Sequence, residues 1–468
     1  MSLSTFKPVP LNIVGQSYEH RSPSISKQRT INLIPQAELT GAAQSSLVSW
    51  YGSVPWSSGT GVGRGLYVFN GVLYKVSDQT LYSIDSSGVQ TSIGTIAGSN
   101  RCVFADDGTN LIITTGSTGY QYSGSTLTSI TDVDFPSSNS VAYLNQKMFY
   151  DGASGQFVVS TVGNPDDIPS NNFATAELSP DDTDRVYSFR ERVYVFGERT
   201  VEPWYDSGSG NPPVARVNGG VMNVGLGAVY SVANTDEYMY WLGDDKRVYR
   251  TSQYQAQNVT STAVSEQLDE LSALDDAVGY VVRLSGQSFY VLNCVAGGRT
   301  FVFSEDANAW FNLSSGQFEG NYVGTDYAEC YGKRLIEYGG NVLYLDKDTY
   351  TDNGATRIYE RTFGPVTAKE LGISGRVLMS YIDFHMQTGV GIISGQGSNP
   401  QIMVSASYDD QSWTNEDDVL LGRQGQGDLL ARWDNTASFY HAHFRIRCSD
   451  PVFLAIHGAS IGVKPGGY

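Results

Sequence analysis

Hydrophobic and polar residues alternate in short runs along most of this chain. The clearest run is Leu66–Ile84, LYVFNGVLYKVSDQTLYSI, in which Asn70-Gly71 separates two alternating segments. Because Asn-Gly readily adopts the positive φ angles of a two-residue hairpin, this dipeptide indicates two antiparallel strands. A second turn at Ser77–Gln79 returns the chain, so the whole run predicts three strands.

The same pattern returns at starts about 35 to 50 residues apart, which is the spacing of four-stranded propeller blades. The further copies begin near Cys102, Val141, Val186, Val229, Val278 and Tyr322. One small antiparallel sheet cannot bury both faces, whereas sheets stacked radially bury each face against a neighbour. We therefore expect an all-β fold in which residues 61–366 form a β-propeller-like domain of six or seven blades. The alternative is a pair of stacked β-sandwiches.

Longer alternating segments replace this pattern from about Thr367. They are Val377–Met386, Gln401–Tyr408, Tyr440–Arg447 and Val452–Ile456. Strands of this kind predict a C-terminal β-sandwich-like domain over residues 367–468. Residues 1–60 lack the repeated pattern apart from Thr30–Ile34, so we interpret them as an N-terminal arm that supplies a strand to the ring or to a neighbouring molecule.

The composition agrees with many short strands and tight turns. Charged residues make up 17% of the chain, below the roughly 25% usual for soluble domains. Glycine (51 residues) permits the turns, and tyrosine (30 residues) suits a pleated, half-buried surface. The best helical pattern is Ser261–Asp276, where Val264, Leu268 and Leu271 recur at helical spacing, and it predicts one short helix.

The charge balance bears on possible partners. Lysine and arginine total 30 against 48 aspartates and glutamates, a formal net charge of −18. Proteins that grip nucleic acid do so by displacing counterions with clustered cations. We therefore expect DNA to be repelled by this chain and met only as weakly contacted cargo.

Cysteine spacing and the first residues bear on the compartment. The four cysteines form no CxxC pair, so buried free thiols are favoured over zinc or disulfides: Cys102, Cys294, Cys330 and Cys448. Met1–Pro10 has polar and proline residues where a signal peptide needs a basic start and an apolar run. No apolar run is long enough to span a bilayer, so we expect no membrane insertion.

The residue types that do chemistry are sparse. His441 and His443 alternate on one predicted strand, but no third metal ligand lies nearby in the sequence, so packing is favoured. No G-x-S-x-G occurs in a strand–turn–helix context. Four glycines resemble a phosphate loop but lack a lysine and a following helix, which indicates a flexible connection instead: Gly59, Gly61, Gly63 and Gly65. We expect no catalytic residue, no metal and no cofactor, and thus no enzyme.

An alternative function uses the acidic clusters, because glycoside hydrolysis needs paired carboxylates. The clusters, such as Asp166-Asp167 and Asp275-Asp276, lie in turn-like surroundings where Asp caps its own backbone. A glycan-binding or glycan-cleaving propeller of a phage tail or bacterial surface protein would use aromatic platforms such as Trp204, Trp241 and Trp310. Packing between blades is the competing interpretation of these tryptophans.

Ser407–Trp413 resembles an Asp-box hairpin, S-x-D-x-G-x-T-W, in which the Asp caps the turn and the Trp packs beneath it. This copy is one residue short and lacks the Gly. Because the box is a folding device, it indicates a β-hairpin and says nothing for hydrolysis.

Ser17–Glu38 resembles the opening of the packaged-DNA stabilisation proteins of short-tailed bacteriophages. That family has a Ser-Pro element, a Gln-Arg pair and an Asn-Leu-Tyr-Pro-Glu-like strand. The corresponding residues here are Ser22-Pro23, Gln28-Arg29 and Asn32–Gln36, with Ile34 and Gln36 in place of Tyr and Glu.

The C-terminal part is similar to the same family in the order of its elements, but residues 435–440 replace an Arg-Leu-Gly-Arg element. The matching stretches are Ser405–Trp413, Gly422-Arg423, Arg432-Trp433, Phe444–Arg447, Ser449–Val452, Ala455 and Gly458-Ala459. The positions that the resemblance marks as structural are Asn32, Pro35, Asp409, Trp413, Trp433, Asp450 and Pro451.

The resemblance implies a tail hub, also called a tail accessory factor or nozzle, in the virion. Six copies in the relatives attach below the portal adaptor, or head-completion protein, as a ring that retains packaged DNA and lets it out during genome ejection. The same ring gives tailspikes, fibres or a needle their platform. Such a chain would be made in the cytoplasm of the host bacterium.

Overall fold

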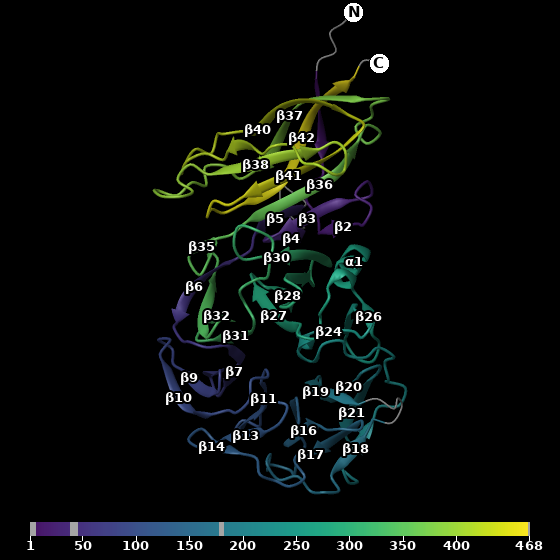
Figure 1. Ribbon diagram of the computed structural model, residues 1–468, viewed down its shortest axis with the longest axis vertical. Helices are drawn as coiled ribbons and strands as arrows, with labels where there is room; N and C mark the ends of the chain where they lie inside the picture. Colours follow the sequence, from purple (N-terminus) through teal and green to yellow (C-terminus); the bar gives the residue numbers. More distant parts are fainter. Residues whose placement is uncertain (1–5, 38–44, 177–181, 467–468) are drawn as a thin grey trace, which may run out of the picture.

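The computed structural model describes residues 6–37, 45–176 and 182–466, and most of its regular structure is β-strand. A ring of small sheets lies at one end of the molecule and a sandwich of two larger sheets at the other (Figure 1). The only α-helix in these ranges, α1 (Thr262–Glu270), contacts β2 (Tyr18–Glu19). No helix among the described residues is both long enough and apolar enough to cross a bilayer.

Seven four-stranded antiparallel blades form the ring within the described ranges, which confirms the prediction of six or seven blades. Each of the first five blades is one stretch of chain. Their strands, blade by blade, are β7 (Gly63–Phe69), β8 (Val72–Ser77), β9 (Thr80–Ile84) and β10 (Gln90–Thr95); β11 (Val103–Asp106), β12 (Leu111–Thr114), β13 (Gly119–Tyr122) and β14 (Leu127–Ser129); β15 (Val141–Leu144), β16 (Lys147–Asp151), β17 (Gln156–Val159) and β18 (Phe173–Thr175); β19 (Thr183–Phe189), β20 (Arg192–Gly197), β21 (Val201–Asp206) and β22 (Val214–Arg216); β23 (Ala233–Asn234), β24 (Met239–Leu242), β25 (Val248–Thr251) and β26 (Gln257–Asn258).

The predicted hairpin of the first blade is present. Asn70 and Gly71 have φ angles of 50° and 75°, and the flanking residues Phe69 and Val72 pair directly. Positive φ at both central residues matches the right-handed twist of the two strands, which explains the tight return of the chain. The fourth blade turns in the same way through Arg190 and Glu191.

The sixth blade is also one stretch of chain, whereas the seventh is completed by a strand from the N-terminal part. The sixth consists of β27 (Val278–Leu284), β28 (Gln287–Cys294), β29 (Arg299–Ser304) and β30 (Ala309–Leu313). The seventh consists of β31 (Tyr327–Cys330), β32 (Lys333–Tyr338), β33 (Asn341–Asp346) and, from the N-terminal part of the chain, β6 (Gly52–Ser57). β6 pairs antiparallel with β33, and β34 (Thr351–Asp352) and β35 (Ala355–Thr356) extend the same sheet. A strand that precedes the first blade therefore closes the ring.

Aromatic side chains fill the spaces between blades. Tyr74 of the first blade faces Tyr122 of the second, with ring centroids 5.6 Å apart. Phe196 of the fourth meets Trp241 of the fifth edge to face at 5.8 Å. Because each blade covers its faces with its neighbours, no blade is complete alone.

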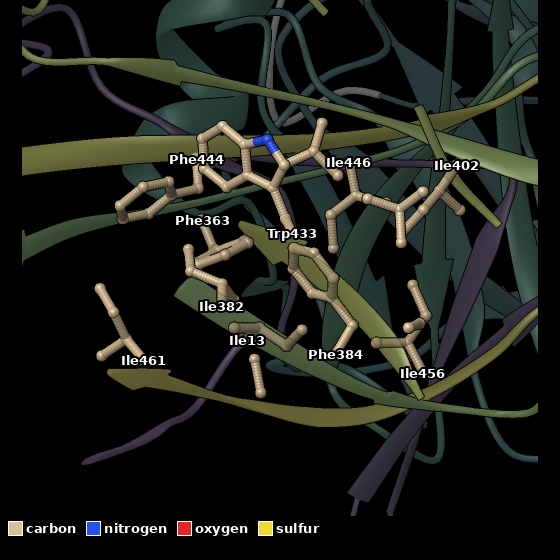
Figure 2. Packing of buried hydrophobic residues seen from close by; sticks show 14 of the residues in the cluster. Ile13, Phe363, Ile382, Phe384, Ile402, Trp433, Phe444, Ile446, Ile456 and Ile461 are labelled. Atoms are coloured by element: carbon tan, nitrogen blue, oxygen red, sulfur yellow. The ribbon is translucent and has the colours of Figure 1, made fainter. Parts of the chain in front are cut away.

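Two sheets form the sandwich. One contains β4 (Leu33–Ala37), β5 (Ser45–Ser49), β42 (Ala455–Pro465), β37 (Val377–Met386) and β40 (Ala431–Phe439), with β1 (Lys7–Leu11) paired to β42. The other contains β3 (Lys27–Ile31), β36 (Tyr359–Thr367), β41 (His441–Cys448), β38 (Gln401–Ser407) and β39 (Asp417–Leu420). Their facing sides bury one apolar core, in which Trp433 lies among Phe444, Ile382 and Phe384 (Figure 2).

The ring and the sandwich share a sheet. The last strand of the sixth blade, β30, pairs in parallel with β3 through Ile31 and Asn312, and β3 pairs antiparallel with β36. Ten strands therefore form one sheet that begins in the ring and ends in the sandwich. The N-terminal part of the chain supplies the strand that joins them (Figure 1).

Some predicted boundaries were wrong. The helix ends at Glu270, nine residues long, although Leu271 and Leu274 are buried in extended chain beyond it. The predicted strand Val452–Ile456 begins only at Ala455 and runs on to Pro465, because Leu454 donates its N–H to the Ser49 hydroxyl outside any ladder. β40 was not predicted, since its exposed positions are polar and interrupt the apolar run.

Candidate functional site: the ring channel and the ring–sandwich junction

Asn32 lies at the junction of ring and sandwich, where the chain turns from β3 into β4 with φ 57°. The Asn32 Nδ2 donates to the carbonyls of Ser314 at 2.7 Å and Ile358 at 2.6 Å, and its Oδ1 accepts the Ser314 N–H at 3.1 Å. Ser314 follows the sixth blade, and Ile358 precedes the sandwich strand β36. One fully buried side chain thus connects three parts of the molecule.

Arg357, beside Ile358, fixes the connection between β5 and β6. Its Nη1 lies 3.0 Å from Asp352 Oδ1 and donates to the Tyr51 carbonyl at 2.9 Å, and its Nη2 donates to the Trp50 carbonyl. Burial by itself lowers the pKa of Arg357, but the Asp352 carboxylate and nearby tyrosines outweigh it, so the pKa lies above its usual value. The closing strand of the ring is therefore tied to the sandwich linker by a buried ion pair.

Arg361, four residues on, is buried without any acidic partner at ion-pair distance in the described structure. It donates to the Ile13 carbonyl at 2.7 Å, the Thr30 hydroxyl at 2.9 Å and the Gln28 amide oxygen at 2.7 Å. Burial lowers the pKa of Arg361 to about 9, which still leaves it charged at neutral pH. Neutral oxygens of the N-terminal segment therefore solvate this cation.

A row of ion pairs crosses the shared sheet. Arg29 of β3 lies 2.9 Å from Glu319 Oε2. On the neighbouring strands, Glu360 Oε2 lies 3.4 Å from Arg447, which in turn is 3.1 Å from Glu416. These side chains are half-buried and alternate in sign, so the row strengthens the joint between β3, β36 and β41.

Two of the marked positions lie inside the sandwich. Pro35 pairs with Leu47 between β4 and β5. Trp433 of β40 is 2% exposed, and its Nε1 donates to Asp417 Oδ2 at 2.9 Å, which connects the two sheets across the core. The indole nitrogen is satisfied in this way while the rings pack apolar neighbours (Figure 2).

Asp450 and Pro451 form the turn that follows β41. Asp450 Oδ2 accepts the Gln401 N–H at 3.0 Å, and its carbonyl accepts the Val452 N–H at 2.8 Å. The marked positions thus lie at the junction, in the sandwich and in two turns, and the structure brings them into no common pocket.

The Asp-box-like turn is only partly as expected. Asp409 Oδ1 accepts the backbone N–H groups of Gln411 at 2.9 Å and Ser412 at 2.8 Å, and hydrogen bonds from Ser412 hold the pKa of Asp409 below its usual range. The Trp413 ring contacts β41, where its centroid lies 4.5 Å from the Arg445 guanidinium.

His441 and His443 do lie on one side of β41, and both contact Asp410, at 3.2 Å and 3.1 Å. Burial lowers the pKa of His443 although the Asp410 charge opposes it. Lys27 of β3 donates to the Asp410 carbonyl. These contacts place the histidines between the arm strand and the sandwich. No cluster of three potential metal ligands occurs in the described ranges.

A cavity of about 320 Å³ lies in the channel of the ring. Arg101 and Arg185 reach it from the second and fourth blades. The Nη2 of Arg101 lies 2.9 Å from Asp326 Oδ2. Arg185, by contrast, is 8% exposed and its Nε has no hydrogen-bond partner among the described atoms. The channel therefore contains an incompletely neutralised cation.

A buried carboxyl separates the first and last blades. Glu337 of β32 is 0% exposed, and burial, with the nearby Asp326 charge, raises its pKa to about 8. A Cβ at Gly63 would overlap this carboxyl. The glycine run is therefore no phosphate loop but the close approach of β7 to the seventh blade, and Gly65 likewise lies against Phe104.

The tryptophans proposed as glycan platforms are buried, which makes that interpretation wrong. Trp241 and Trp310 are 0% and 2% exposed, and Trp204 is 9% exposed. Trp204 packs edge to face on Phe157 at 5.0 Å between the third and fourth blades. They serve the packing of the ring.

Sequence reasoning missed Arg101, Arg185, Arg357 and Arg361. The available signal was an arginine within or next to a strand with apolar residues, as with Arg357 and Arg361 in RIYER at 357–361. A buried arginine needs several acceptors, so such a residue indicates a joint between segments.

A sequence model of the family described as "Bacteriophage P22 Gp10, beta-propeller" matches residues 8–350. No curated protein matches the chain. Among solved structures, BamB from Moraxella catarrhalis is 9% identical with a TM-score of 0.40, covering 74% of this chain and 98% of its own. The Neurospora crassa Pan2 WD40 domain is 9% identical with a TM-score of 0.41, covering 67% and 98%. The designed Ika8 protein is 7% identical with a TM-score of 0.41, covering 63% and 100%.

Proposed function

The chain belongs to the bacteriophage P22 Gp10 β-propeller family and is a phage structural protein, and on that premise we propose that it is the hub, or nozzle, of a short-tailed phage tail. In this role six copies form a hexamer below the portal adaptor, or head-completion protein. The hexamer, as distinct from the ring of blades within each copy, retains packaged DNA and forms its exit channel during genome ejection. It also offers a docking surface to tailspikes, fibres or a needle.

The shared ten-stranded sheet carries this proposal. A β-ladder between blade and sandwich resists bending far better than a flexible linker, so forces applied to one part reach the other. A subunit of that kind suits a scaffold held between a pressurised head and the host surface. Residues 61–366 act as the rigid block, and residues 1–60 and 367–468 make the contacts with neighbouring subunits.

The charge supports a channel that does not hold DNA. Each copy carries a net charge of −18, so the hexamer has few cations that could bind DNA phosphates. Little free energy would therefore be gained by releasing counterions from the DNA. DNA then passes as weakly contacted cargo. We propose that the protein catalyses no reaction, binds no cofactor and does not insert into a membrane. We propose also that it is made in the host cytoplasm and assembled into the virion tail.

Imaging of intact particles tests the role, with a tag inserted after Gly320, an open position at which a Cβ would meet no atom within 4 Å. We expect the tag at the tail vertex, repeated around the axis, and a sedimenting ring only when the adaptor is added. A tag elsewhere on the particle, or tight binding of the purified chain to duplex DNA at physiological salt, would contradict the proposal.

A further inference from the structure

We infer that the channel of the ring holds a small oxyanion, free phosphate or a small carboxylate, between Arg101 and Arg185. This site is independent of the proposed tail role, because it lies within one subunit. It rests on the placement of the two arginines, on their unused donors and on the cavity between them.

The cavity lies where the blades meet. The innermost strands β7, β11, β19, β23, β27 and β31, with residues shortly before β11, β23 and β31, supply its lining. The lining includes Tyr67, Arg101, Arg185, Tyr230, Tyr280 and Asp326. At about 320 Å³ it has room for phosphate or a small carboxylate with water, and none for a nucleic-acid duplex.

The hydroxyls around the cavity are already engaged as donors. Tyr67 donates to Asp106 at 2.7 Å, and Tyr280 donates to the Gly324 carbonyl at 2.8 Å. Tyr187, on which the Arg185 guanidinium lies 5.5 Å from the ring centroid, donates to Asn234 at 2.6 Å. The donors left for a ligand therefore belong to the arginines.

Arg185 has one protein acceptor, the Val229 carbonyl, and no carboxylate at ion-pair distance in the described chain. Asp151, the acid whose charge acts on it, accepts hydrogen bonds from Ser138 and Ser140 instead. Burial lowers the pKa of Arg185, because the charged guanidinium loses contact with water and has no carboxylate beside it to compensate.

Arg101 supplies the second cation of the site. It uses only its Nη2 on Asp326 and the Thr325 carbonyl, at 2.9 Å and 3.3 Å. Two guanidinium groups, those of Arg101 and Arg185, and one carboxylate, that of Asp326, line the cavity. Planar guanidinium donors match the spacing of phosphate and carboxylate oxygens, which is why an oxyanion fits this site better than chloride.

Thermal unfolding of the full-length chain with inorganic phosphate, against chloride at constant ionic strength, tests the site. Binding to the folded state alone raises Tm with phosphate concentration. We expect Arg185→Gln to weaken the apparent phosphate affinity about tenfold or more, as loss of a charge-assisted contact requires. A parallel titration with acetate distinguishes the carboxylate source from the phosphate source.

Arg190→Gln is the matched control, since this arginine of the same blade is exposed and donates to the Asp236 and Ser252 carbonyls. It should keep the wild-type response. A wild-type Tm indifferent to both anions, or an equal response in Arg185→Gln, overturns the inference. If Arg185→Gln does not fold, tungstate anomalous density in the wild type decides: a peak between the two guanidinium groups supports the site, and a peak elsewhere or none rejects it.

Discussion

Single buried polar residues fix the relation between the parts of this molecule. Asn32, Arg357 and Arg361 together reach the arm, the sixth and seventh blades and the sandwich. Leaving a buried polar group without its partner costs more free energy than the hydrogen bond contributes to stability. We therefore expect substitutions at these positions to be destabilising. Asn32 could be singled out from the sequence by its motif, whereas the arginines could not, because their acceptors come from distant segments.

Asn32→Ala should lower the free energy of unfolding by about 3 kcal/mol, because it leaves the polar groups of Ser314 and Ile358 unpaired. Denaturant titration measures the change. Asn353→Ala is the control, since Asn353 also has a positive φ, 50°, but an exposed side chain. Equal losses in the two variants would mean that backbone conformation, and not the buried hydrogen bonds, accounts for the effect.

Glu337 should make the stability of the ring depend on pH. Its pKa of about 8 in the fold exceeds the ordinary value of 4.5, so its contribution is complete below pH 4.5 and is lost as the pH rises through 8. Between pH 5 and pH 9 this loss is on the order of 4 kcal/mol, and Glu337→Gln should remove it. Unfolding titrations at pH 5 and pH 9 measure this difference, and Glu329→Gln, exposed in the same blade, should retain the wild-type profile.

At the scale of elements, the sequence predicts hairpins between neighbouring strands but not the pairing of strands that are distant in the chain. Hairpins within blades could be predicted because Asn70-Gly71 and its counterparts determine the turn beside the strands that it joins. The pairing of β6 with β33, and of β3 with β30, could not, because alternation shows that a segment is a strand but not which distant edge it meets. The two domains could thus be anticipated, but not the sheet that they share.

Arg357→Met should release the segment between β5 and β6 and lower the free energy of unfolding by about 3–5 kcal/mol, since Asp352 would stay buried without its partner. The double variant with Asp352→Asn should recover part of this loss. Arg283→Met breaks an exposed pair with Asp236 and should cost less than about 1 kcal/mol. Similar losses from both single variants would show that burial does not matter here.

At the scale of the whole molecule, the shared sheet joins ring and sandwich into one cooperative unit. We expect a single calorimetric transition in which the van't Hoff and calorimetric enthalpies agree. Two separated transitions would show that the ladder between β30 and β36, through β3, does not couple the parts. The sequence does not predict this coupling, because the linking strand β3 is far in the chain from both β30 and β36.

The closure of the seventh blade by β6 also dictates an order of events during translation. Residues 52–57 cannot find their partner until residues 341–346 have left the ribosome, a wait of about 15 to 60 s at 5–20 residues per second. β1 must wait longer still, for β42. A nascent chain is therefore an open arc, and only the finished polypeptide can present the surfaces of a complete subunit.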